Sequence, residues 1–366
     1  MKLPQFWPLF WQTVRYGVFA VLGLLGASVW QWSQLHSLQP PAAQPTVALL
    51  QGDIKPAFQS QALQRLSQAI QTPTISRQSA SPLQKAQTQQ AFDALHRQFQ
   101  RHYPLIYQEL KPQRMGNSLL MHWPGKSKSA VLLAGHLDVV PAEAEAWQQG
   151  PFSGALAGGY VWGRGTLDDK GTALAILEAT ERLLDSGFVP RQDIYIALGE
   201  DEEIGGTQGA MRMAAALKSK GVKLSGVLDE GMLVVPGSMI GMEKPVALIG
   251  LAEKGYLTLE LRVKQAGGHS SMPARETAVD ILAQALVRIR QSPLPPRLNA
   301  PADQLFAWLA PEMKGFQRWA LANLWLTEPL LISQLQNKPA TAALIQTTVA
   351  PTMLSASAKE NVLASD

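Results

Sequence analysis

Apolar residues follow two different spacings along the chain, and these separate a helical region from a longer region of mixed structure. Residues 56–115 are predicted to be mainly helical, because Phe92, Leu95 and Phe99 recur at a spacing that places them on one helix face. We assign this stripe to packing in a core. Residues 33–54 contain Pro and Gln without such a stripe and are predicted to be a linker.

From Asn117 onward, short apolar runs alternate with helical periodicity. The predicted strands are 117–123, 129–138, 193–203 and 226–231, and the predicted helices between them are 170–187 and 205–221. Alternation of this kind predicts an α/β sandwich built on a mostly parallel sheet. In such sheets ligands bind beyond the carboxyl ends of the strands, so we examine those ends for chemistry.

A second region begins near Glu253. Residues 256–264 alternate apolar and polar side chains and predict a strand, which is followed by the turn sequence GGHSSMP and by a helix that begins near Glu276. Mixed helical sequence with several Pro and Trp fills 291–340. The segments TTVAPTMLSAS and KENVL predict further strands near the C-terminus.

The N-terminal segment is apolar enough to cross a membrane. Residues 16–32 carry no charge, Trp7 and Trp11 precede them, and Trp30 and Trp32 close the run. Paired tryptophans at both ends are typical of the aromatic belts at membrane interfaces. As a helix, the stretch from Trp11 to Trp32 would rise about 30 Å, the thickness of one hydrocarbon core.

Charges around this segment predict its orientation. Lys2 and Arg15 precede it, and no Lys or Arg follows until Lys55. The positive-inside rule therefore favours a cytoplasmic N-terminus, a single crossing and an extracytoplasmic location for the rest of the chain. The alternative is a cleaved signal peptide and a secreted protein, because the small residues of 40–44 offer a processing site.

Composition narrows the chemistry. The chain has 366 residues, enough for two domains. Its net charge of +4 is small and scattered, which argues against a nucleic-acid partner. It contains no cysteine, so disulfides, a Cys nucleophile and thiolate metal sites are excluded, and any metal must be held by His and carboxylates.

A His and an Asp lie two residues apart in GHLDVVP, at the end of a predicted strand. Residues at this spacing in a strand share a face, so the carboxylate of Asp138 can orient the imidazole of His136 for metal binding. Taken alone, the pair also fits a structural His.

Three acidic clusters follow at predicted strand ends or at a helix start. The acidic residues singled out in GRGTLDDKG, GEDEEIGG and VLDEG are Asp168, Asp169, Asp201, Glu202, Glu203, Asp229 and Glu230. The first pair alone also fits a helix N-cap, and the middle run also fits a solvated loop. Together with the His, however, these carboxylates meet at one sheet edge. They form the ligand set of divalent ions, and a bridging Asp lets two ions sit about 3.5 Å apart.

The ordered motifs GHxDVVP, GRGxxDDKG, DEEIGG, LDEG and GGHSSMP resemble the co-catalytic di-zinc aminoacylase/carboxypeptidase metallopeptidases, peptidase family M20. The resemblance is closest to the membrane-anchored or vacuolar carboxypeptidases that also hydrolyse N-acyl amino acids. It implies a zinc-dependent hydrolase that cleaves amide bonds in peptides or N-acyl amino acids with a free C-terminal carboxylate.

The resemblance also implies a fold: α/β, a phosphorylase/hydrolase-like zinc exopeptidase sandwich with an inserted α+β lid (dimerisation) domain. It therefore implies a homodimer formed through the lid. We expect a transmembrane anchor or signal at 1–32, a linker at 33–54, the first part of the zinc catalytic domain at 55–252, and an incomplete lid domain at 253–366.

By resemblance, two zinc ions per subunit share the acidic edge. His136 matches the His ligand of one zinc, and Asp168 matches the bridging ligand, whose following peptide bond is often cis in this family. Glu203 matches a ligand of the other zinc. The remaining carboxylate ligand is either Asp229 or Glu230, and the sequence leaves both open.

The catalytic roles also come from the resemblance. Glu202 matches the general base, and Asp138 the carboxylate that orients the His ligand. His269, in GGHSS, matches a lid His that reaches the active site of the partner subunit and stabilises the oxyanion, although a plain loop His is the alternative. Asn361, in KENVL, matches an Asn that faces the substrate.

Two family features fall outside this sequence. A final His ligand and an Arg that binds the substrate carboxylate would both follow Asp366. We therefore expect a truncated chain, or a fragment of a longer precursor, that binds fewer than two zinc ions tightly and shows little or no amidase activity. The alternative function is an inactive, metal-binding remnant that dimerises or sits at the membrane.

Overall fold

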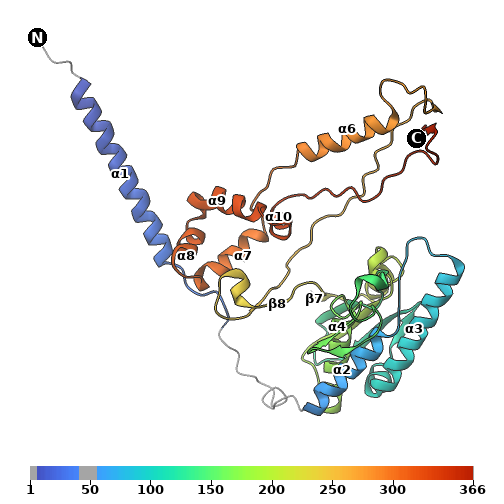
Figure 1. The fold of residues 1–366 in the computed structure, drawn as a ribbon. Coiled ribbons are helices and arrows are strands. Elements are labelled where there is room, and N and C mark those ends of the chain that lie inside the picture. The colour runs from blue at the N-terminus through green and yellow to red at the C-terminus, as the bar shows by residue number, and fades with distance from the viewer. Residues whose placement is uncertain (1–5, 41–55, 366) are drawn as a thin grey trace, which may run out of the picture. The chain divides into compact units, whose positions relative to one another are not determined.

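The computed structural model describes residues 6–40 and 56–365 and divides into two compact units (Figure 1). One unit is Gln44–Gly231, and the other combines Met1–Ala43 with Met232–Asp366. Most of the predicted linker, residues 41–54, lies outside the described residues. The expected division at 252–253 between catalytic and lid domains stays a prediction.

A five-stranded sheet forms the centre of the Gln44–Gly231 unit. Its strands are β1 (Gln113–Met115), β2 (Ser118–Trp123), β3 (Ala130–His136), β6 (Asp193–Gly199) and β7 (Leu224–Leu228), in the order β1-β2-β6-β3-β7. Strand β3 runs parallel to both β6 and β7, whereas β2 runs antiparallel to β6 and to β1. The sheet is therefore mixed, and its parallel part is the half that carries the acidic loops.

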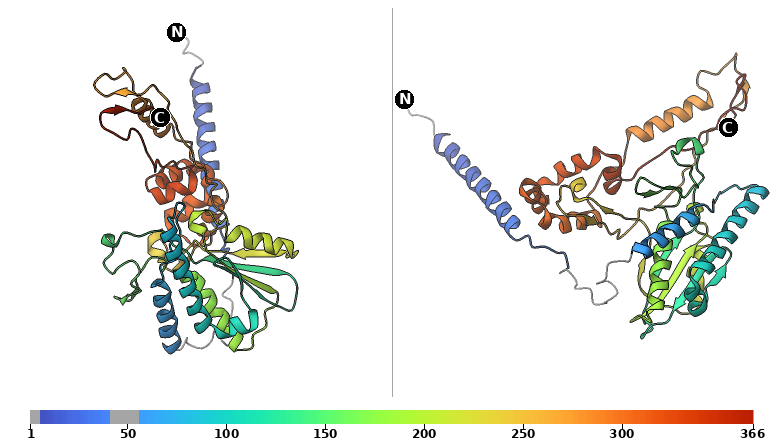
Figure 2. Two further views of the ribbon diagram at one scale, coloured as in Figure 1. Left: turned by 90° about the vertical axis from the view of Figure 1, so that its right-hand side faces the viewer. Right: turned by 60° about the horizontal axis from the view of Figure 1, so that its bottom comes forward.

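Helices cover the two faces of this sheet (Figure 2). The helices of the unit are α2 (Pro56–Ile70), α3 (Pro82–His102), α4 (Lys170–Asp185) and α5 (Ala210–Ser219). Successive side chains of a strand point to opposite faces, so Leu119 and Met121 pack beneath α2, α3 and α4 while Leu120 packs in the cluster that includes α5. The result is a three-layer α/β sandwich.

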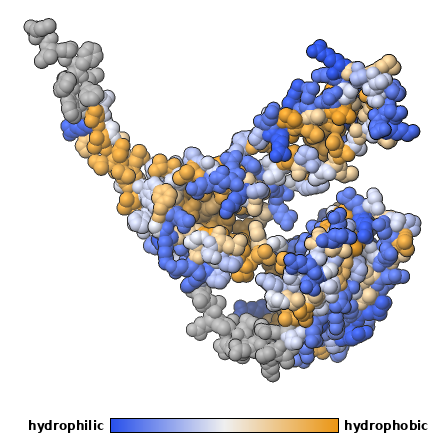
Figure 3. All heavy atoms as spheres, viewed as in Figure 1, coloured by the Kyte–Doolittle hydropathy of each residue, from blue (hydrophilic) through white to orange (hydrophobic). Residues whose placement is uncertain are grey.

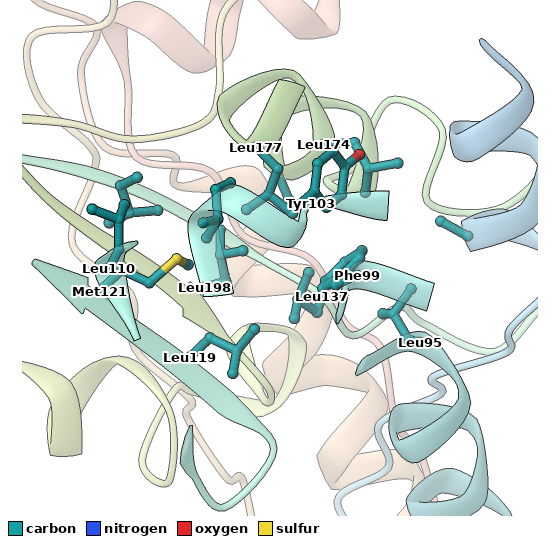
Figure 4. Packing of buried hydrophobic residues seen from close by; sticks show 14 of the residues in the cluster. Leu95, Phe99, Tyr103, Leu110, Leu119, Met121, Leu137, Leu174, Leu177 and Leu198 are labelled. Carbon is teal, nitrogen blue, oxygen red and sulfur yellow. The ribbon is translucent and has the colours of Figure 1, made fainter. Parts of the chain in front are cut away.

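The helical stripe expected in α3 is confirmed as core. Phe92, Leu95 and Phe99 are 1%, 0% and 2% exposed. Figure 4 shows Leu95 and Phe99 in this core, which Leu137, directly after β3, also joins. The Ser81 side chain accepts a hydrogen bond from the Gln84 N–H and thus caps the helix where its stripe begins.

Shorter elements complete this unit. They are η2 (Ile106–Leu110), η3 (Ala144–Ala146), β4 (Leu156–Ala157), β5 (Tyr160–Val161) and η4 (Glu202–Ile204). The last of these turns directly follows β6 and carries two of the acidic residues singled out above.

The other unit is mainly helical. Its helices are α1 (Phe6–Ser33), η5 (Gly237–Ile240), α6 (Ala278–Gln291), α7 (Ala302–Leu309), η6 (Ala310–Glu312), α8 (Gly315–Ala322), α9 (Leu324–Gln336) and α10 (Pro339–Ile345). Its strands are two short pairs: β8 (Val234–Val235) with β9 (Val246–Ala247), and β10 (Gly268–His269) with β11 (Val362–Leu363). The helices expected near Glu276 and within 291–340 are therefore present.

Two strands expected in this unit do not form. Residues 256–264 and 347–357 have no ladder partner and no regular secondary structure. Tyr256 and Leu257 are 92% and 83% exposed. An alternating pattern produces a strand only where a neighbouring strand satisfies its backbone groups and another layer covers its apolar face. Residues 260–263 lie near α6 and near residues 355–356 around a shared pocket, but among the described residues no strand pairs with either segment.

One described helix is long and apolar enough to cross a membrane. The candidate span is Gln12–Ser33, 22 residues within α1. Nearly all of its described side chains are exposed, as is expected for a surface that faces lipid rather than a protein core. The side chains of Trp7 and Trp11, and the residue Lys2, lie outside the described residues.

Candidate metal centre

The predicted ligands converge where three parallel strands end. His136 is the last residue of β3, Glu202 and Glu203 follow β6, and Glu230 follows β7. Asp168 lies in the loop that precedes α4, the helix that packs against β3. Because the carboxyl ends of parallel strands share one edge of the sheet, residues far apart in sequence meet there.

His136 is at the centre of the cluster. Its Nε2 atom lies 2.9 Å from Asp168 Oδ1, 3.3 Å from Glu230 Oε2 and 3.9 Å from Glu202 Oε2. Two overlapping groups can hold a metal ion, His136 with Glu202 and Glu230, and His136 with Asp168 and Glu203; in each, the ligand atoms lie within 4.8 Å of one another. The imidazole is 2% exposed, whereas the Asp168 side chain is 65% exposed. The cluster is thus anchored on a buried ring and opens to solvent.

Asp138 joins the ring to the neighbouring loop. Its Oδ1 lies 3.3 Å from His136 Nδ1, on the side of the ring away from the cluster. The backbone N–H groups of Glu202 and Glu203 donate to its two oxygens at 3.1 and 3.3 Å, and the Ser76 hydroxyl donates at 2.6 Å. Asp138 is fully buried. One carboxylate therefore fixes both the imidazole and the loop after β6.

A hydrogen bond to the backbone of His136 fixes the loop that precedes α4. Asp169 Oδ2 accepts a hydrogen bond from the His136 N–H at 3.2 Å, and the Asp168–Asp169 peptide bond is cis, as the family resemblance implies. Asp169 occupies the N-cap position of α4, but its side chain makes no capping hydrogen bond. The N-cap interpretation of this acidic pair is therefore not supported.

The carboxylates of the cluster shift the pKa of the groups beside them. Burial lowers the pKa of His136, but hydrogen bonds to Asp138 and Glu230 outweigh it and raise the pKa to about 12. Burial raises the pKa of Glu202 and of Glu203, and the neighbouring carboxylates raise both further. Each shift favours a proton, or another positive charge, among these groups.

The residues fit a divalent metal ion. Glu203 Oε1 is buried and has no hydrogen-bond partner, although buried polar atoms nearly always have one. A bound cation would satisfy it. The set of one imidazole nitrogen and several carboxylate oxygens is one that divalent ions such as zinc accept, and the chain has no thiolate to compete.

The structure distinguishes Asp229 from Glu230, the two residues that the sequence offered for the remaining carboxylate ligand. Glu230 belongs to one of the ligand groups. Asp229 belongs to neither, and its carboxylate accepts a hydrogen bond from the Glu230 N–H at 2.9 Å. The geometry therefore favours Glu230 as the ligand from the loop after β7.

Two predicted site residues lie in the other unit, beside each other. Strand β10 contains His269 and pairs with β11, so that the Ser270 N–H donates to the Asn361 carbonyl at 3.1 Å. His269 Nδ1 lies 2.7 Å from the hydroxyl of Ser271. The lid residues expected to contact substrate thus form one local pair.

Sequence reasoning missed two supporting residues. Ser76 hydrogen-bonds Asp138 from a segment with no motif around it. Lys170 is fully buried, and its ammonium donates to the carbonyls of Ala69 and Thr72 at 3.1 and 2.6 Å, which ties the start of α4 to the end of α2. The signal for Lys170 was available, because it directly follows the Asp pair in DDKG at a helix start.

Comparison with known proteins identifies related chains. The sequence pattern of Peptidase family M20/M25/M40 matches residues 132–321. The chain is 46% identical over 233 residues to "N-fatty-acyl-amino acid synthase/hydrolase PM20D1" of Xenopus tropicalis, a match that covers 63% of this chain and 46% of that protein. It is 37% identical over 339 residues to "Probable carboxypeptidase S-like 2" of Dictyostelium discoideum, which covers 90% of this chain and 65% of that protein.

Among solved structures, the novel di-peptidase Dug1p from Saccharomyces cerevisiae matches with a TM-score of 0.49 and 18% identity, over 84% of this chain and 68% of that chain. The chain spans between about half and two thirds of the length of the two curated relatives named above.

Proposed function

Since the chain belongs to peptidase family M20/M25/M40, we propose that it is a zinc-dependent hydrolase that cleaves the amide bond of peptides or N-acyl amino acids with a free carboxylate. The convergence of His136, Asp168, Glu203 and Glu230 at one sheet edge carries this proposal. The substrate class follows the printed names of the relatives, which include an N-fatty-acyl-amino acid synthase/hydrolase and carboxypeptidase S-like proteins.

The proposed ligands divide between two ions. His136 and Glu230 would hold the first, Glu203 would hold the second, and Asp168 would be available to both. When bound, zinc lowers the pKa of a coordinated water to near neutrality and polarises a carbonyl group. Asp138 keeps the imidazole in one orientation, because Nδ1 lies 2.9 Å from its backbone carbonyl and 3.3 Å from its carboxylate, which leaves Nε2 free for the metal.

Glu202 is the proposed general base. It accepts a proton from the attacking water and passes it to the departing amine nitrogen. Its carboxylate lies 3.9 Å from His136 Nε2, at the margin of the cluster, and is 55% exposed, so substrate and water can reach it. Burial raises the pKa of this carboxyl, which favours proton uptake during the reaction.

His269 and Asn361 are the proposed substrate contacts of the lid. We propose a homodimer in which His269 stabilises the oxyanion at the partner subunit's metal centre. Mixing His269→Ala chains with Glu202→Ala chains should restore part of the activity that each variant lacks, since a mixed dimer contains one complete site. Absence of rescue in mixed dimers would place His269 in its own subunit's site or outside catalysis.

The apolar helix α1 is the proposed membrane anchor, with its N-terminus in the cytoplasm. The support is the candidate span Gln12–Ser33, with Arg15 near its start. Alkaline phosphatase fused after Gly52 should be active in a bacterial host, because it would be exported. A soluble or cytoplasmic fusion would contradict the anchor.

The hydrolase proposal is tested with two substrates and with the carboxamide form of each, in which the free carboxylate is blocked. Zinc-loaded chain is incubated with an N-fatty-acyl amino acid and with an N-blocked dipeptide, and mass spectrometry follows the released amine. A hydrolase function predicts release that stops after chelation and that falls when the substrate carboxylate is replaced by a carboxamide. No zinc-dependent release from either substrate would contradict a hydrolase function for this chain.

A further inference from the structure

Four helices of the α1-containing unit form a cluster in which α8 packs against one end of α1. We call α7–α10, residues 302–345, the helical platform. The Trp319 indole donates to the Ser28 hydroxyl at 3.4 Å, and the Asn323 amide donates to the Ser28 carbonyl at 3.2 Å. The Arg318 guanidinium donates to the Leu35 carbonyl at 2.8 Å. Ser28 and Asn323 are 2% and 0% exposed, so this junction is packed rather than incidental.

The junction lies at a defined depth along the candidate membrane span. The platform's hydrogen bonds to α1 and the chain after it fall between Ser28 and Ser37, whereas the span runs from Gln12 to Ser33. Trp30 and Trp32 stand at this same end. Tryptophan is enriched where hydrocarbon meets headgroups. An α1 that crosses a bilayer would therefore hold the platform at the membrane surface.

The platform presents apolar side chains that its own packing does not use. Helix α9 is apolar around most of its circumference, yet Thr327 is its one buried residue. Trp325, Leu326 and Leu330 are 48%, 50% and 49% exposed, and Phe316 of α8 is 65% exposed. A helix that is apolar all round is normally buried in a core or in lipid.

Apolar surface also runs from α1 into the platform. A shallow groove between the end of α1 and the start of α8 is lined by apolar Val29, Trp32 and Met313 together with Ser33, Lys314, Gly315 and Arg318. Figure 3 shows the apolar surface of α1 itself. The candidate span and the platform thus share an apolar border at their junction.

Charge argues for lipid as the occupant of the apolar surface. The platform contains three acidic residues, Asp303, Glu312 and Glu328, and three basic residues, Lys314, Arg318 and Lys338. It therefore has no net charge to attract an acidic or basic partner. Exposed Trp, Phe and Leu without excess charge suit the interface of an uncharged, zwitterionic bilayer.

We propose that the helical platform docks on the bilayer surface, with Phe316, Leu326 and Leu330 at the headgroup–acyl boundary next to the point where α1 leaves the membrane. This proposal rests on the membrane anchor proposed above. The platform is then a second, peripheral membrane contact that restrains the unit which also carries His269 and Asn361.

The absence of cysteine allows a direct test on the full chain. Phe316→Cys, Leu326→Cys and Leu330→Cys are each labelled with a nitroxide, and the chain is reconstituted in phosphatidylcholine vesicles. Collision with oxygen, which concentrates in lipid, is compared with collision with a water-soluble nickel chelate. Leu22→Cys on α1 is the lipid control, and Val287→Cys on α6, 52% exposed in the native chain, is the aqueous control.

We expect an oxygen-to-nickel accessibility ratio for the platform labels several-fold above that of the Val287→Cys label. Ratios equal to the aqueous control, with Leu22→Cys in lipid, would overturn platform docking and keep the anchor. An aqueous Leu22→Cys label would overturn both. Loss of accessibility to both reagents would show a protein, such as a second copy, on this face and would also overturn the proposal. Three positions are used so that one misfolded variant does not decide the result.

Discussion

The two units differ in what their apolar residues contact. In the Gln44–Gly231 unit, Leu95 is fully buried between helices and sheet, whereas Leu257 of the other unit is 83% exposed. The first unit closes a core from its own strands and helices, and the metal centre lies at the edge of that core. The second unit exposes apolar surface on unpaired segments and on the platform. The candidate metal centre, whose ligands must be placed precisely, therefore lies on the Gln44–Gly231 unit, which has a closed core. The exposed apolar surfaces, which could contact a partner, lie on the unit that contains α1.

The largest effect expected on the metal centre is loss of turnover without loss of metal. Glu202→Ala should lower kcat by about 10²–10⁴-fold and keep the zinc content unchanged, because a general base moves protons without holding the ions. Glu203→Ala is the matched control one residue away, and it should lose zinc. Metal analysis and steady-state kinetics measure both. Zinc loss in the Glu202 variant with retention in the Glu203 variant would reverse the two roles.

The contrast in packing predicts a large difference between two identical substitutions. Leu95→Ala should destabilise the Gln44–Gly231 unit by about 2–5 kcal/mol, because it opens a cavity under a sheet. Leu257→Ala removes the same atoms from an exposed site and should change stability by less than about 0.5 kcal/mol. Urea denaturation, with amide exchange of core residues as the readout, measures the free energy of unfolding of both variants. A large effect at Leu257 would mean that a partner covers this segment in solution.

The sequence was sufficient to predict the core stripe and the meeting of the acidic loops in the first unit, because these signals are local and agree. The stripe of Phe92, Leu95 and Phe99 is buried as expected, and the strand ends bring the acidic loops together. The antiparallel half of the sheet was not predicted. The clue to one antiparallel pair lies in two residues: Gly116 and Asn117 join β1 to β2 with a positive φ at Gly116, which makes them a hairpin rather than strands of a parallel sheet.

The same pattern reasoning failed at residues 256–264. Alternation reports which face a strand would bury, but it carries no information on whether a neighbouring strand is present to bind its backbone. The choice between Asp229 and Glu230 was open for a related reason. Adjacent residues near a strand end point in different directions, and only the loop geometry decides which one reaches His136.

A smaller effect is expected from the carboxylate that orients the ring. Asp138→Asn should weaken zinc affinity by about 10–100-fold, because the amide is a weaker acceptor for His136 Nδ1 and also disturbs the bonds to the Glu202 and Glu203 backbone. Asp93→Asn, at a 39%-exposed carboxylate paired with Arg114, is the control and should leave affinity unchanged. Competition with a chromophoric chelator measures both. Equal affinity in the two variants would remove Asp138 from the metal site.

The smallest expected effect compares two capping boxes of the same geometry, one in each unit. The Ser81 and Thr277 hydroxyls accept from the N–H of Gln84 and of Asp280, both at 3.3 Å. Removal of such a cap costs about 1 kcal/mol.

For Ser81→Ala this loss should appear in the global stability of the Gln44–Gly231 unit, because α3 supplies a whole stripe of its core. For Thr277→Ala the loss should stay within α6, where Ala278 is the one buried residue, and should leave the amides of β3 and β6 unchanged. Hydrogen exchange resolves the two cases residue by residue. The Thr277 variant could instead show exchange in β3 and β6 as fast as that of the Ser81 variant. The two units would then unfold as one cooperative structure, despite their different packing.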